Sequence, residues 1–228
     1  MTQAQLLADG IIEMNLQVSK QTQEKLLAYL KLLQKWNKVY NLTSVRDPLE
    51  MVILHLLDSL SVLSYIKANS LLDVGSGGGL PGIVLAICMP ELQVTTIDTV
   101  QKKTIFMRQV KGELGLNNCE VIHARVEKYT PQSKFDVIIS RAFSDIALFI
   151  KLTQHLITPN GHWLAMKGLI PHAEISEVVN KPLSIVPLEV AGLEAERHLL
   201  IFNNGIANHS PLKISQALRA ANENISDY

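Results

Sequence analysis

The sequence predicts an α/β protein with one doubly wound, mostly parallel seven-stranded sheet and an N-terminal helical extension. Three observations favour this fold. From residue 71 onward, short apolar runs alternate with helical segments, as in strands joined by crossover helices. A glycine cluster separates the first of these strands from the helix that follows it. Before residue 71 the periodicity is helical, and no Gly-, Pro- or Ser-rich linker marks off a second unit.

We therefore expect residues 1–70 to form a helical extension packed on a main domain over 71–203, with a tail over 204–228. A chain of 228 residues is long enough to bury a core without disulfides or metals. Hydrophobic residues make up 47% of the chain and charged residues 18%, which excludes the disordered class. A last helix is expected over 211–222.

Two long helices are predicted in the extension. Leu26, Leu30 and Leu33 recur at helical spacing, and the lysines of this segment fall mostly on the other side. The second helix is expected to begin with Asp47 as N-cap, and Glu50 completes a capping box. Its apolar stripe comprises Leu49, Val52, Ile53, Leu56, Leu57 and Leu60.

The main domain is expected to alternate strands with helices. Strands are predicted over 71–74, 93–97, 119–123, 135–139, 162–166, 183–188 and 198–202. Helices are predicted over 81–88, 100–114, 145–156 and 172–180.

The glycine-rich turn from Asp73 to Gly82 is the most informative stretch. Glycines let a backbone approach a ligand closely, and a helix N-terminus after them favours a negative group. In doubly wound sheets, ligands bind beyond the carboxyl ends of the strands. Taken alone, such a turn also fits a dinucleotide site or a tight connection without a ligand.

Three details favour S-adenosylmethionine over NAD. Leu80 stands where a dinucleotide fingerprint has its third glycine, and the acid Asp73 would repel a pyrophosphate but suits an amino group. Asp98 ends the second strand, 23 residues after Gly75, where an acid accepts hydrogen bonds from ribose hydroxyls. The expected cofactor contacts are Asp73, Gly75, Gly77, Gly79 and Asp98, with Val126 and Glu127 framing the adenine unless they form a plain surface turn.

With these pieces placed, residues 20–203 resemble the bacterial small-subunit ribosomal RNA guanine-N7 methyltransferases, the family called RsmG or GidB. The glycine turn alone would match many methyltransferases, whereas the matches over residues 35–44 and 55–59 and at Ser140-Arg141-Ala142 are more specific. Gly78 occupies a slot that is often Pro in relatives, which should loosen the loop slightly and leave the chemistry intact. The matching blocks are 35–44, 55–59, 73–82, 125–127, 140–142, 167–168 and 196–198.

The resemblance implies a Rossmann-like class I methyltransferase domain over 71–203. It implies S-adenosyl-L-methionine as cofactor, S-adenosyl-L-homocysteine as product, and N7 of guanosine 527 in the 530 loop of 16S ribosomal RNA as target. In the family, the residues that line the cofactor site match Gly75, Leu80, Val126, Glu127 and Arg141.

The residues after the fourth predicted strand fit N7 chemistry. Ser140-Arg141-Ala142-Phe143 is not the Asn/Asp-Pro-Pro-aromatic loop of exocyclic amine methylation, and Cys88 and Cys119 are misplaced to act as nucleophiles. Guanine N7 already presents a lone pair, so catalysis can come largely from positioning. Arg141 is the candidate catalytic residue, to hold the cofactor, a phosphate or guanine O6, unless it is only an ion-pair partner.

Any contact with RNA must be local, because Lys plus Arg and Asp plus Glu balance at 21 each. The basic residues clustered over 102–111 would equally fit a solvated helix face that does not contact RNA. The candidate phosphate contacts are Lys38, Arg46, Lys102, Lys103, Arg125 and Lys167.

Several polar and aromatic residues have a structural interpretation beside the functional one. His55 and Asp58, three residues apart on a helix, are expected to form a hydrogen-bonded pair. Trp36 and Tyr40 are expected in the core rather than on a base-stacking platform. Phe143 is either a core aromatic or a stacking partner for a flipped base.

The remaining expectations concern location and partners. The N-terminus lacks signal-peptide features, and the uncharged stretch 74–90 is too broken for a membrane span. The two cysteines have no metal-ligand spacing. We therefore expect a cytoplasmic monomer without metal or membrane partner. The alternatives are a methyltransferase acting on another RNA or a small molecule, and a non-enzymatic binding module.

Overall fold

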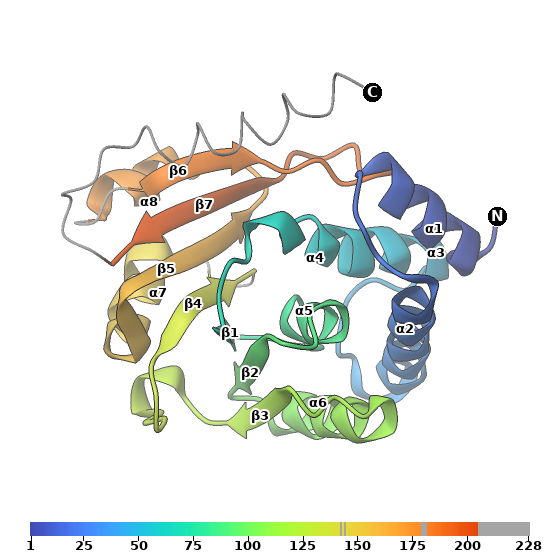
Figure 1. The fold of residues 1–228 in the computed structure, drawn as a ribbon, viewed down its shortest axis with the longest axis horizontal. Coiled ribbons are helices and arrows are strands. Elements are labelled where there is room, and N and C mark those ends of the chain that lie inside the picture. The colour runs from blue at the N-terminus through green and yellow to red at the C-terminus, as the bar shows by residue number, and fades with distance from the viewer. Residues whose placement is uncertain (142, 144, 179–181, 205–228) are drawn as a thin grey trace.

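The computed structural model describes residues 1–141, 143, 145–178 and 182–204, which form a seven-stranded sheet with helices on both faces (Figure 1). The strand order is β3-β2-β1-β4-β5-β7-β6. The strands are β1 (Ser70–Val74), β2 (Gln93–Asp98), β3 (Cys119–His123), β4 (Phe135–Ser140), β5 (Ile157–Lys167), β6 (Pro182–Pro187) and β7 (His198–Asn203).

The predicted doubly wound, mostly parallel sheet is confirmed. The five strands from β3 to β5 pair in parallel, and β7 runs antiparallel to both of its neighbours. The chain leaves β1 toward β2 and β3, then returns to place β4 on the other side, so β1 and β4 flank the switch point. β5 begins five residues earlier than predicted, because a register shift in β4 lets Ile157 pair with Phe135.

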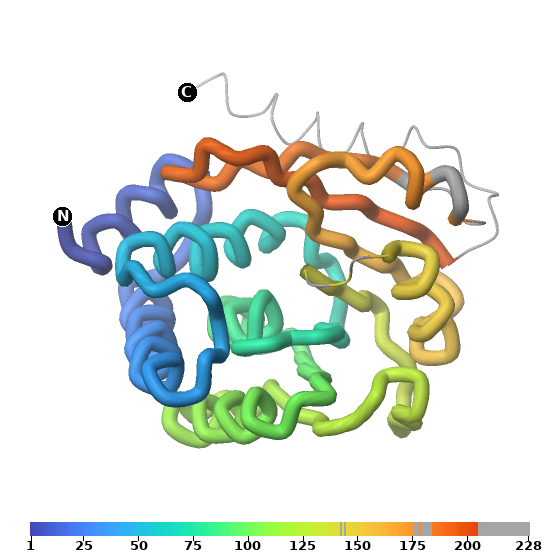
Figure 2. Tube along the Cα trace, turned by 180° about the vertical axis from the view of Figure 1, so that it is seen from behind, coloured from blue at the N-terminus to red at the C-terminus, as the bar shows by residue number. Residues whose placement is uncertain are grey.

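Helices cover the sheet in two groups. The extension and one face comprise α1 (Gln3–Glu13), α2 (Lys20–Tyr40), α3 (Pro48–Met51), the π-helix η1 (Val52–Leu57), α4 (Asp58–Leu60), η2 (Leu63–Tyr65), α5 (Gly82–Cys88) and α6 (Gln101–Leu114). The other elements are η3 (Val126–Lys128), α7 (Ile146–Thr153), η4 (Gln154–Leu156) and α8 (His172–Glu177). Seen from behind, the extension lies beside α5 and α6 (Figure 2).

Alternate residues of the central strands feed two separate cores. Leu71 and Leu164 face the core that contains α2, α5 and α6, whereas Leu72 and Ala165 face the core that contains α7. Successive side chains of a strand point to opposite faces, so a sheet covered on both sides reads as a continuous apolar run. Both faces of the sheet are therefore packed, which fixes the position of the carboxyl ends of its strands.

The apolar stripe predicted for α2 is confirmed. Leu26, Leu30 and Leu33 are buried, and Ser19 caps the helix by accepting a hydrogen bond from the backbone of Thr22. Asn41, in the left-handed conformation, ends the helix. The long apolar face packs α2 onto the main domain.

The second predicted helix begins as expected but does not stay regular. Asp47 accepts hydrogen bonds from the backbone N–H groups of Leu49 and Glu50, which confirms it as N-cap. Residues 52–57 then form a π-helix, which the apolar spacing did not reveal. The stretch Pro48–Tyr65 is long and apolar enough to cross a membrane by length and composition alone, and 56% of it is buried inside the protein.

Two predicted helices differ from the structure at their ends. α7 stops at Thr153 and passes into a short 3-10 turn, and α8 ends at Glu177 rather than residue 180. The helix predicted over 211–222 lies outside the described residues, as does Ala142.

Packing of α1 on the π-helix depends on a glycine. A Cβ atom on Gly10 would lie 2.6 Å from Cδ1 of Leu57, a fully buried side chain. We expect Gly10→Val to lower the free energy of unfolding by about 1–3 kcal/mol through overpacking, measured by urea denaturation.

Gly112 in α6 is the matched control. A Cβ atom there would meet nothing within 4 Å, so Gly112→Ala should raise the free energy of unfolding by up to about 1 kcal/mol through helix propensity. An unchanged urea midpoint in Gly10→Val would contradict the close approach of α1 to Leu57.

Candidate functional site

The turn between β1 and α5 needs its glycines for two different reasons. Gly75, Gly77 and Gly79 have φ angles of +70°, +60° and +92°, a region that other residues rarely adopt. A Cβ atom on Gly79 would overlap Ile83 at 2.4 Å, whereas one on Gly75 would meet nothing within 4 Å. The turn is thus packed on its α5 side and open to a ligand at Gly75. Leu80, expected at the cofactor, is buried.

Asp73 fastens the turn to the helix behind it. Its Oδ2 accepts a hydrogen bond from the backbone N–H of Gly82 at 2.9 Å. The fit is so close that a Cβ atom on Gly82 would lie 2.7 Å from that oxygen. Burial raises the pKa of Asp73 to about 7, against the lowering effect of the Gly82 N–H.

The second oxygen of Asp73 tests the fit of the expected cofactor. Asp73 Oδ1 is buried and has no hydrogen-bond partner within the described residues. A buried acceptor without a donor is costly, so it favours a donor group at the turn, as an amino group would provide. The open backbone at Gly75 and this oxygen both fit S-adenosylmethionine.

Asp98 connects the same turn to α6. Its Oδ2 accepts from the backbone N–H of Gly77 at 2.9 Å, and its Oδ1 accepts from Val100 at 2.8 Å. The Nζ atom of Lys103 lies 3.8 Å away. A carboxylate has about four lone-pair positions, so two single hydrogen bonds leave capacity for the ribose hydroxyls expected here.

The helical extension also braces the turn, through a residue that the sequence did not single out. The Tyr29 hydroxyl donates to the carbonyl oxygen of Gly78 at 2.8 Å, and Tyr29 is fully buried, which raises its pKa. Leu33, one helical turn later, would lie 3.2 Å from a Cβ atom on Gly78. Tyr29 shares the buried stripe of α2, and a buried tyrosine needs a partner, but no local pattern indicates one 49 residues away.

A second site feature lies where the extension meets the ends of β4 and β5. This cavity of about 430 Å³ brings together residues from five of the sequence blocks described above. Ser140 Oγ donates to the carbonyl oxygen of Val74, so Arg141 starts its loop beside the glycine turn. The cavity is lined by Thr43, Ser44, Val45, Leu54, His55, Asp58, Arg141, Met166, Lys167, Gly168 and Arg197.

The Asp58 carboxylate is the centre of this cavity. Its Oδ2 accepts from Arg141 Nη1 at 3.0 Å and its Oδ1 accepts from Arg197 Nε at 2.9 Å, and its side chain is only 3% exposed. Arg141 also donates to the carbonyl oxygen of Leu54 at 2.9 Å. Arg141 therefore takes the ion-pair role considered for it, and a second arginine that the sequence did not single out joins it.

The predicted hydrogen bond between His55 and Asp58 is wrong. His55 Nε2 instead lies 3.0 Å from Thr43 Oγ1, whereas the Asp58 carboxylate accepts from the two guanidinium groups. Burial, with the nearby charge of Arg141, lowers the pKa of His55 to about 4, so its imidazole is neutral at neutral pH.

The residues expected at the adenine stand together after β3. Val126 is buried, and Glu127 is half-buried and pairs with the exposed Arg125. The Glu127 backbone N–H, and after it the hydrogen bond from Arg125, lower the pKa of Glu127. The Arg125 side chain is 68% exposed and faces solvent at the rim.

The other candidate RNA contacts are spread over the rim. Lys38 and Arg46 are exposed, and Lys102 donates to the carbonyl oxygen of Tyr40 at 2.7 Å. Lys167 lies at the end of β5, where it donates to Phe143 O and forms an ion pair with Glu174 at 3.0 Å. Lys167 would have to exchange these partners to reach a phosphate.

The aromatic and sulfur-containing residues are mostly structural. Trp36 packs against Phe106 with ring centroids 5.5 Å apart, but Tyr40, expected in the core, is 44% exposed. Phe143 packs against Phe149 at 5.4 Å and is half-buried.

Burial raises the pKa of both cysteine thiols, Cys88 and Cys119, to about 12, which leaves them unreactive. Within the part of the chain that the structure describes, no group of three or more His, Cys, Asp or Glu side chains is placed to hold a metal.

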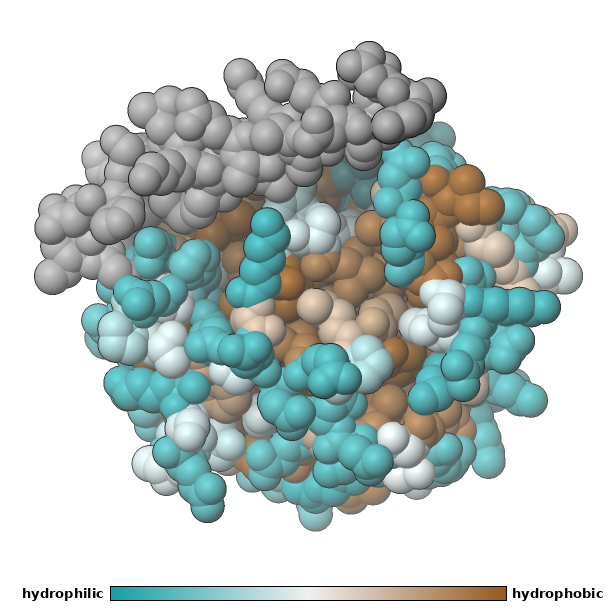
Figure 3. Space-filling view, viewed as in Figure 1, coloured by the Kyte–Doolittle hydropathy of each residue, from teal (hydrophilic) through white to brown (hydrophobic). Residues whose placement is uncertain are grey.

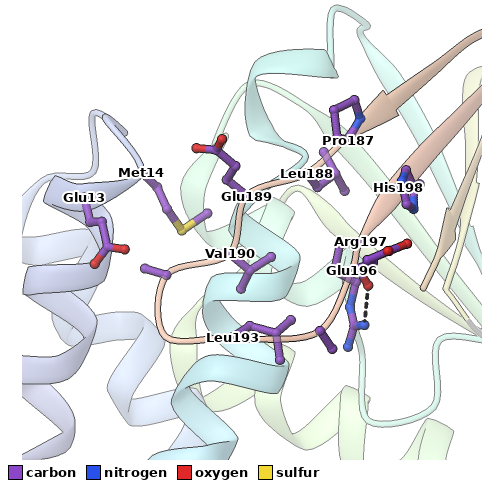
Figure 4. Close-up of a pocket in the computed structure, with 12 residues that line it drawn as sticks. Glu13, Met14, Pro187, Leu188, Glu189, Val190, Leu193, Glu196, Arg197 and His198 are labelled. Carbon is purple, nitrogen blue, oxygen red and sulfur yellow. Dashed lines mark hydrogen bonds between the residues drawn. The ribbon is translucent and has the colours of Figure 1, made fainter. Parts of the chain in front are cut away.

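Another groove, of about 380 Å³, lies between the end of α1 and the β6–β7 connection (Figure 4). Its apolar wall includes Met14, Leu188 and Val190. The carboxylates of Glu13 and Glu189 stand at this groove, so its charge disfavours phosphate groups.

Known proteins similar to this chain are methyltransferases. A family profile described as "GidB: rRNA small subunit methyltransferase G" matches residues 22–200. A protein of Methylobacillus flagellatus, "Ribosomal RNA small subunit methyltransferase G", is 61% identical over 196 residues, which cover 86% of this chain and 96% of the relative. A protein of Aromatoleum aromaticum with the same description is 51% identical over 205 residues, covering 87% and 97%.

Solved structures of low sequence identity share the fold. A SAM-dependent methyltransferase from Aquifex aeolicus superimposes with a TM-score of 0.53 at 18% identity, covering 77% of this chain and 97% of that one. The N-methyltransferase NodS from Bradyrhizobium japonicum, in complex with S-adenosyl-L-homocysteine, gives 0.52 at 13% identity with the same coverage.

Tyr29→Phe should weaken binding of S-adenosylhomocysteine, because it removes the hydrogen bond that holds the Gly78 carbonyl. A lost hydrogen bond of about 0.5–1.5 kcal/mol corresponds to roughly a two- to tenfold higher Kd by calorimetry. Tyr65→Phe is the control, since the half-buried Tyr65 hydroxyl lies outside the site. Equal affinities for both variants would contradict the bracing role of Tyr29.

His55 should make the protein less stable as the pH falls. Its pKa of about 4 in the fold lies below its ordinary value of 6.5, so the unfolded chain takes up the proton first and stability is lost between pH 6.5 and 4. The loss amounts to roughly 2–3 kcal/mol. The raised pKa of Asp73 acts in the opposite sense over the same range, which masks the effect in the wild type.

The comparison of His55→Gln with the wild type isolates this contribution. We expect the stability deficit of His55→Gln at pH 7.5 to shrink as the pH is lowered to 4.5 in urea titrations. The exposed His172→Gln should show a constant difference. A constant deficit for His55→Gln as well would mean that His55 is not held neutral.

Proposed function

The chain belongs to the rRNA small subunit methyltransferase G family, and we propose that it transfers the methyl group of S-adenosylmethionine to N7 of guanosine 527 in the 530 loop of 16S ribosomal RNA. As a member of this family, the chain is an S-adenosylmethionine-dependent methyltransferase of small-subunit ribosomal RNA. The choice of guanosine 527 and of its ring nitrogen N7 as the methylated atom is the proposed part.

The observation that carries the proposal is the arginine pair on Asp58, next to a glycine turn open at Gly75. Two guanidinium groups on one carboxylate leave an excess of one positive charge and several N–H donors at the cavity. Guanine presents the acceptor O6 beside N7, and an arginine N–H that binds O6 alone leaves the N7 lone pair free to attack the methyl group. Arg141 and Arg197 are therefore suited to orient guanine at O6.

The cofactor supplies an electrophilic methyl group, and the chain holds it at the turn. We assign its binding to Asp73, Gly75, Gly77, Gly79, Leu80, Asp98, Val126, Glu127 and Arg141. In this proposal Asp98 accepts from the ribose hydroxyls, which its contact with Gly77 of the glycine turn supports, and the buried Val126 provides an apolar surface for the base.

The proposed chemistry requires no general base. N7 carries no proton that a base would have to remove. The raised pKa values of the buried cysteines leave no reactive thiolate, and the lowered pKa of His55 leaves no imidazolium at neutral pH. Positioning of the two reactants then supplies most of the rate.

RNA binding is proposed for the rim, through Lys38, Arg46, Lys102, Lys103, Arg125 and Lys167.

The chain is proposed to act in the cytoplasm as a monomer. The proposed domain limits are 71–203 for the methyltransferase part and 1–70 for the extension; β7 ends at Asn203, and β1 begins one residue before the proposed boundary, at Ser70.

The test of the function uses radiolabelled S-adenosylmethionine with small subunits, and with naked 16S RNA, from cells that lack the modification. Label at one N7-methylguanine in the 530 loop, located by chemical cleavage and primer extension, is the expected result. Label at another base would refute the proposed target. Activity insensitive to salt between 50 and 200 mM would instead favour a small-molecule substrate.

Asp98→Asn should lower the affinity for S-adenosylhomocysteine, because the charged acceptor for the ribose is lost. Hydrogen bonds to charged groups contribute about 1.5–3 kcal/mol, so calorimetry should give roughly a 10- to 100-fold higher Kd. Asp136→Asn is the matched control.

Asp136 also accepts backbone hydrogen bonds, from Asn69 and Ser70, but at the amino end of β1. Its variant should lose stability and keep the wild-type affinity. Normal affinity in Asp98→Asn would remove Asp98 from the ribose site.

A further inference from the structure

Two neighbouring helices concentrate positive charge in a chain that is neutral overall. α2 carries five lysines and one glutamate, and α6 carries four basic residues and one glutamate. The helices pack side by side, with Trp36 of α2 against Phe106 of α6 (Figure 1). In the space-filling view, long hydrophilic side chains project from the side of the molecule where α2 lies (Figure 3).

A groove of about 670 Å³ runs between these helices. Its apolar floor comes from Ala28, Leu32 and Leu114, and its lysines come from successive turns of α2. The lining residues are Ala28, Lys31, Leu32, Gln34, Lys35, Lys38, Glu113 and Leu114.

The polar groups of the groove are mainly donors without acceptors. Lys31, Lys35 and Lys38 are exposed, and none of them forms an ion pair or side-chain hydrogen bond with the rest of the described chain. Gln34 Nε2 is buried in the same lining and also has no partner there. Glu113 is engaged by Gln109. A ligand that fits must bring negative charge and acceptor oxygens.

We propose that the α2–α6 groove binds the sugar-phosphate backbone of an RNA segment remote from the methylated guanine, through Lys31, Gln34 and Lys35, with Lys38 at the point where the groove meets the rim. The proposal rests on RNA being the substrate. From Lys31 to Lys38 the helix rises about 10.5 Å. That length spans about three phosphates of one nucleic-acid strand.

Basic residues of α6 connect the groove with the glycine turn. Lys102, at the start of α6, bonds to the end of α2 at Tyr40, and the next residue, Lys103, lies beside Asp98. An RNA backbone that follows these residues would run from the groove toward the glycine turn, where Asp98 accepts from Gly77. The groove therefore adds affinity and register and takes no part in methyl transfer.

The test compares two triple variants of equal net charge. Lys31→Gln/Lys35→Gln/Lys38→Gln removes the groove lysines, and Lys67→Gln/Lys134→Gln/Lys151→Gln removes three exposed lysines elsewhere. Binding of naked 16S RNA and of small subunits is measured by filter retention from 50 to 200 mM salt. Calorimetry with S-adenosylhomocysteine checks that the cofactor site of each variant is intact.

For the groove variant we expect the slope of log affinity against log salt to fall by about 2, since each phosphate contact on a single strand contributes roughly 0.7. The control should keep the wild-type slope. Equal slopes in the two variants would overturn the proposal, as would a wild type that binds no RNA. Weaker binding to subunits with unchanged binding to naked RNA would assign the groove to a protein partner, which also overturns it.

The proposed function can fail separately. If label maps to another base while the two slopes still differ, the methylation target falls and the groove assignment stands. If guanosine 527 is methylated equally by both variants and the slopes agree, the groove assignment alone falls.

Discussion

The buried carboxylate of Asp58 is the constraint on which the rest of the site depends. Asp58 comes from the helical extension, Arg141 from the end of β4 and Arg197 from the start of β7, and the two arginines bind one oxygen each. A buried charge is stable only when it is paired, so this carboxylate draws three distant parts of the chain to one point. The extension is therefore part of the site and not an appendage.

Three hydrogen bonds with buried side chains hold the backbone of the glycine turn. Asp73 bonds to Gly82 behind it, Asp98 to Gly77 in front, and Tyr29 of the extension to Gly78 from the side. These contacts fix a backbone that is open toward a ligand at Gly75. Together with a neutral His55 and unreactive thiols, these contacts fit the proposed transfer to a ring nitrogen that carries no proton, in which the site acts by holding the reactants in place.

The sequence predicted what depends on local pattern and missed what depends on contacts between distant segments. The strands, the Asp47 cap and the glycine turn between β1 and α5 follow from spacing and residue type. The π-helix, the Tyr29 contact and the choice of Asp58 for two arginines over His55 arise only from tertiary packing. Family resemblance pointed to the block around Arg197 but could not say that its guanidinium meets Asp58.

The most direct measurement is a double-mutant cycle of Asp58→Asn and Arg197→Gln, read out as stability and as methyl transfer to small subunits. If one carboxylate joins the extension to β7, the double variant should lose less than the sum of the single losses, with a coupling of about 1–3 kcal/mol in the free energy of unfolding. The turnover of the two single variants should fall to a similar level, and the double variant should fall little further. Additive losses in both measurements would contradict the account, because the two residues would then act independently.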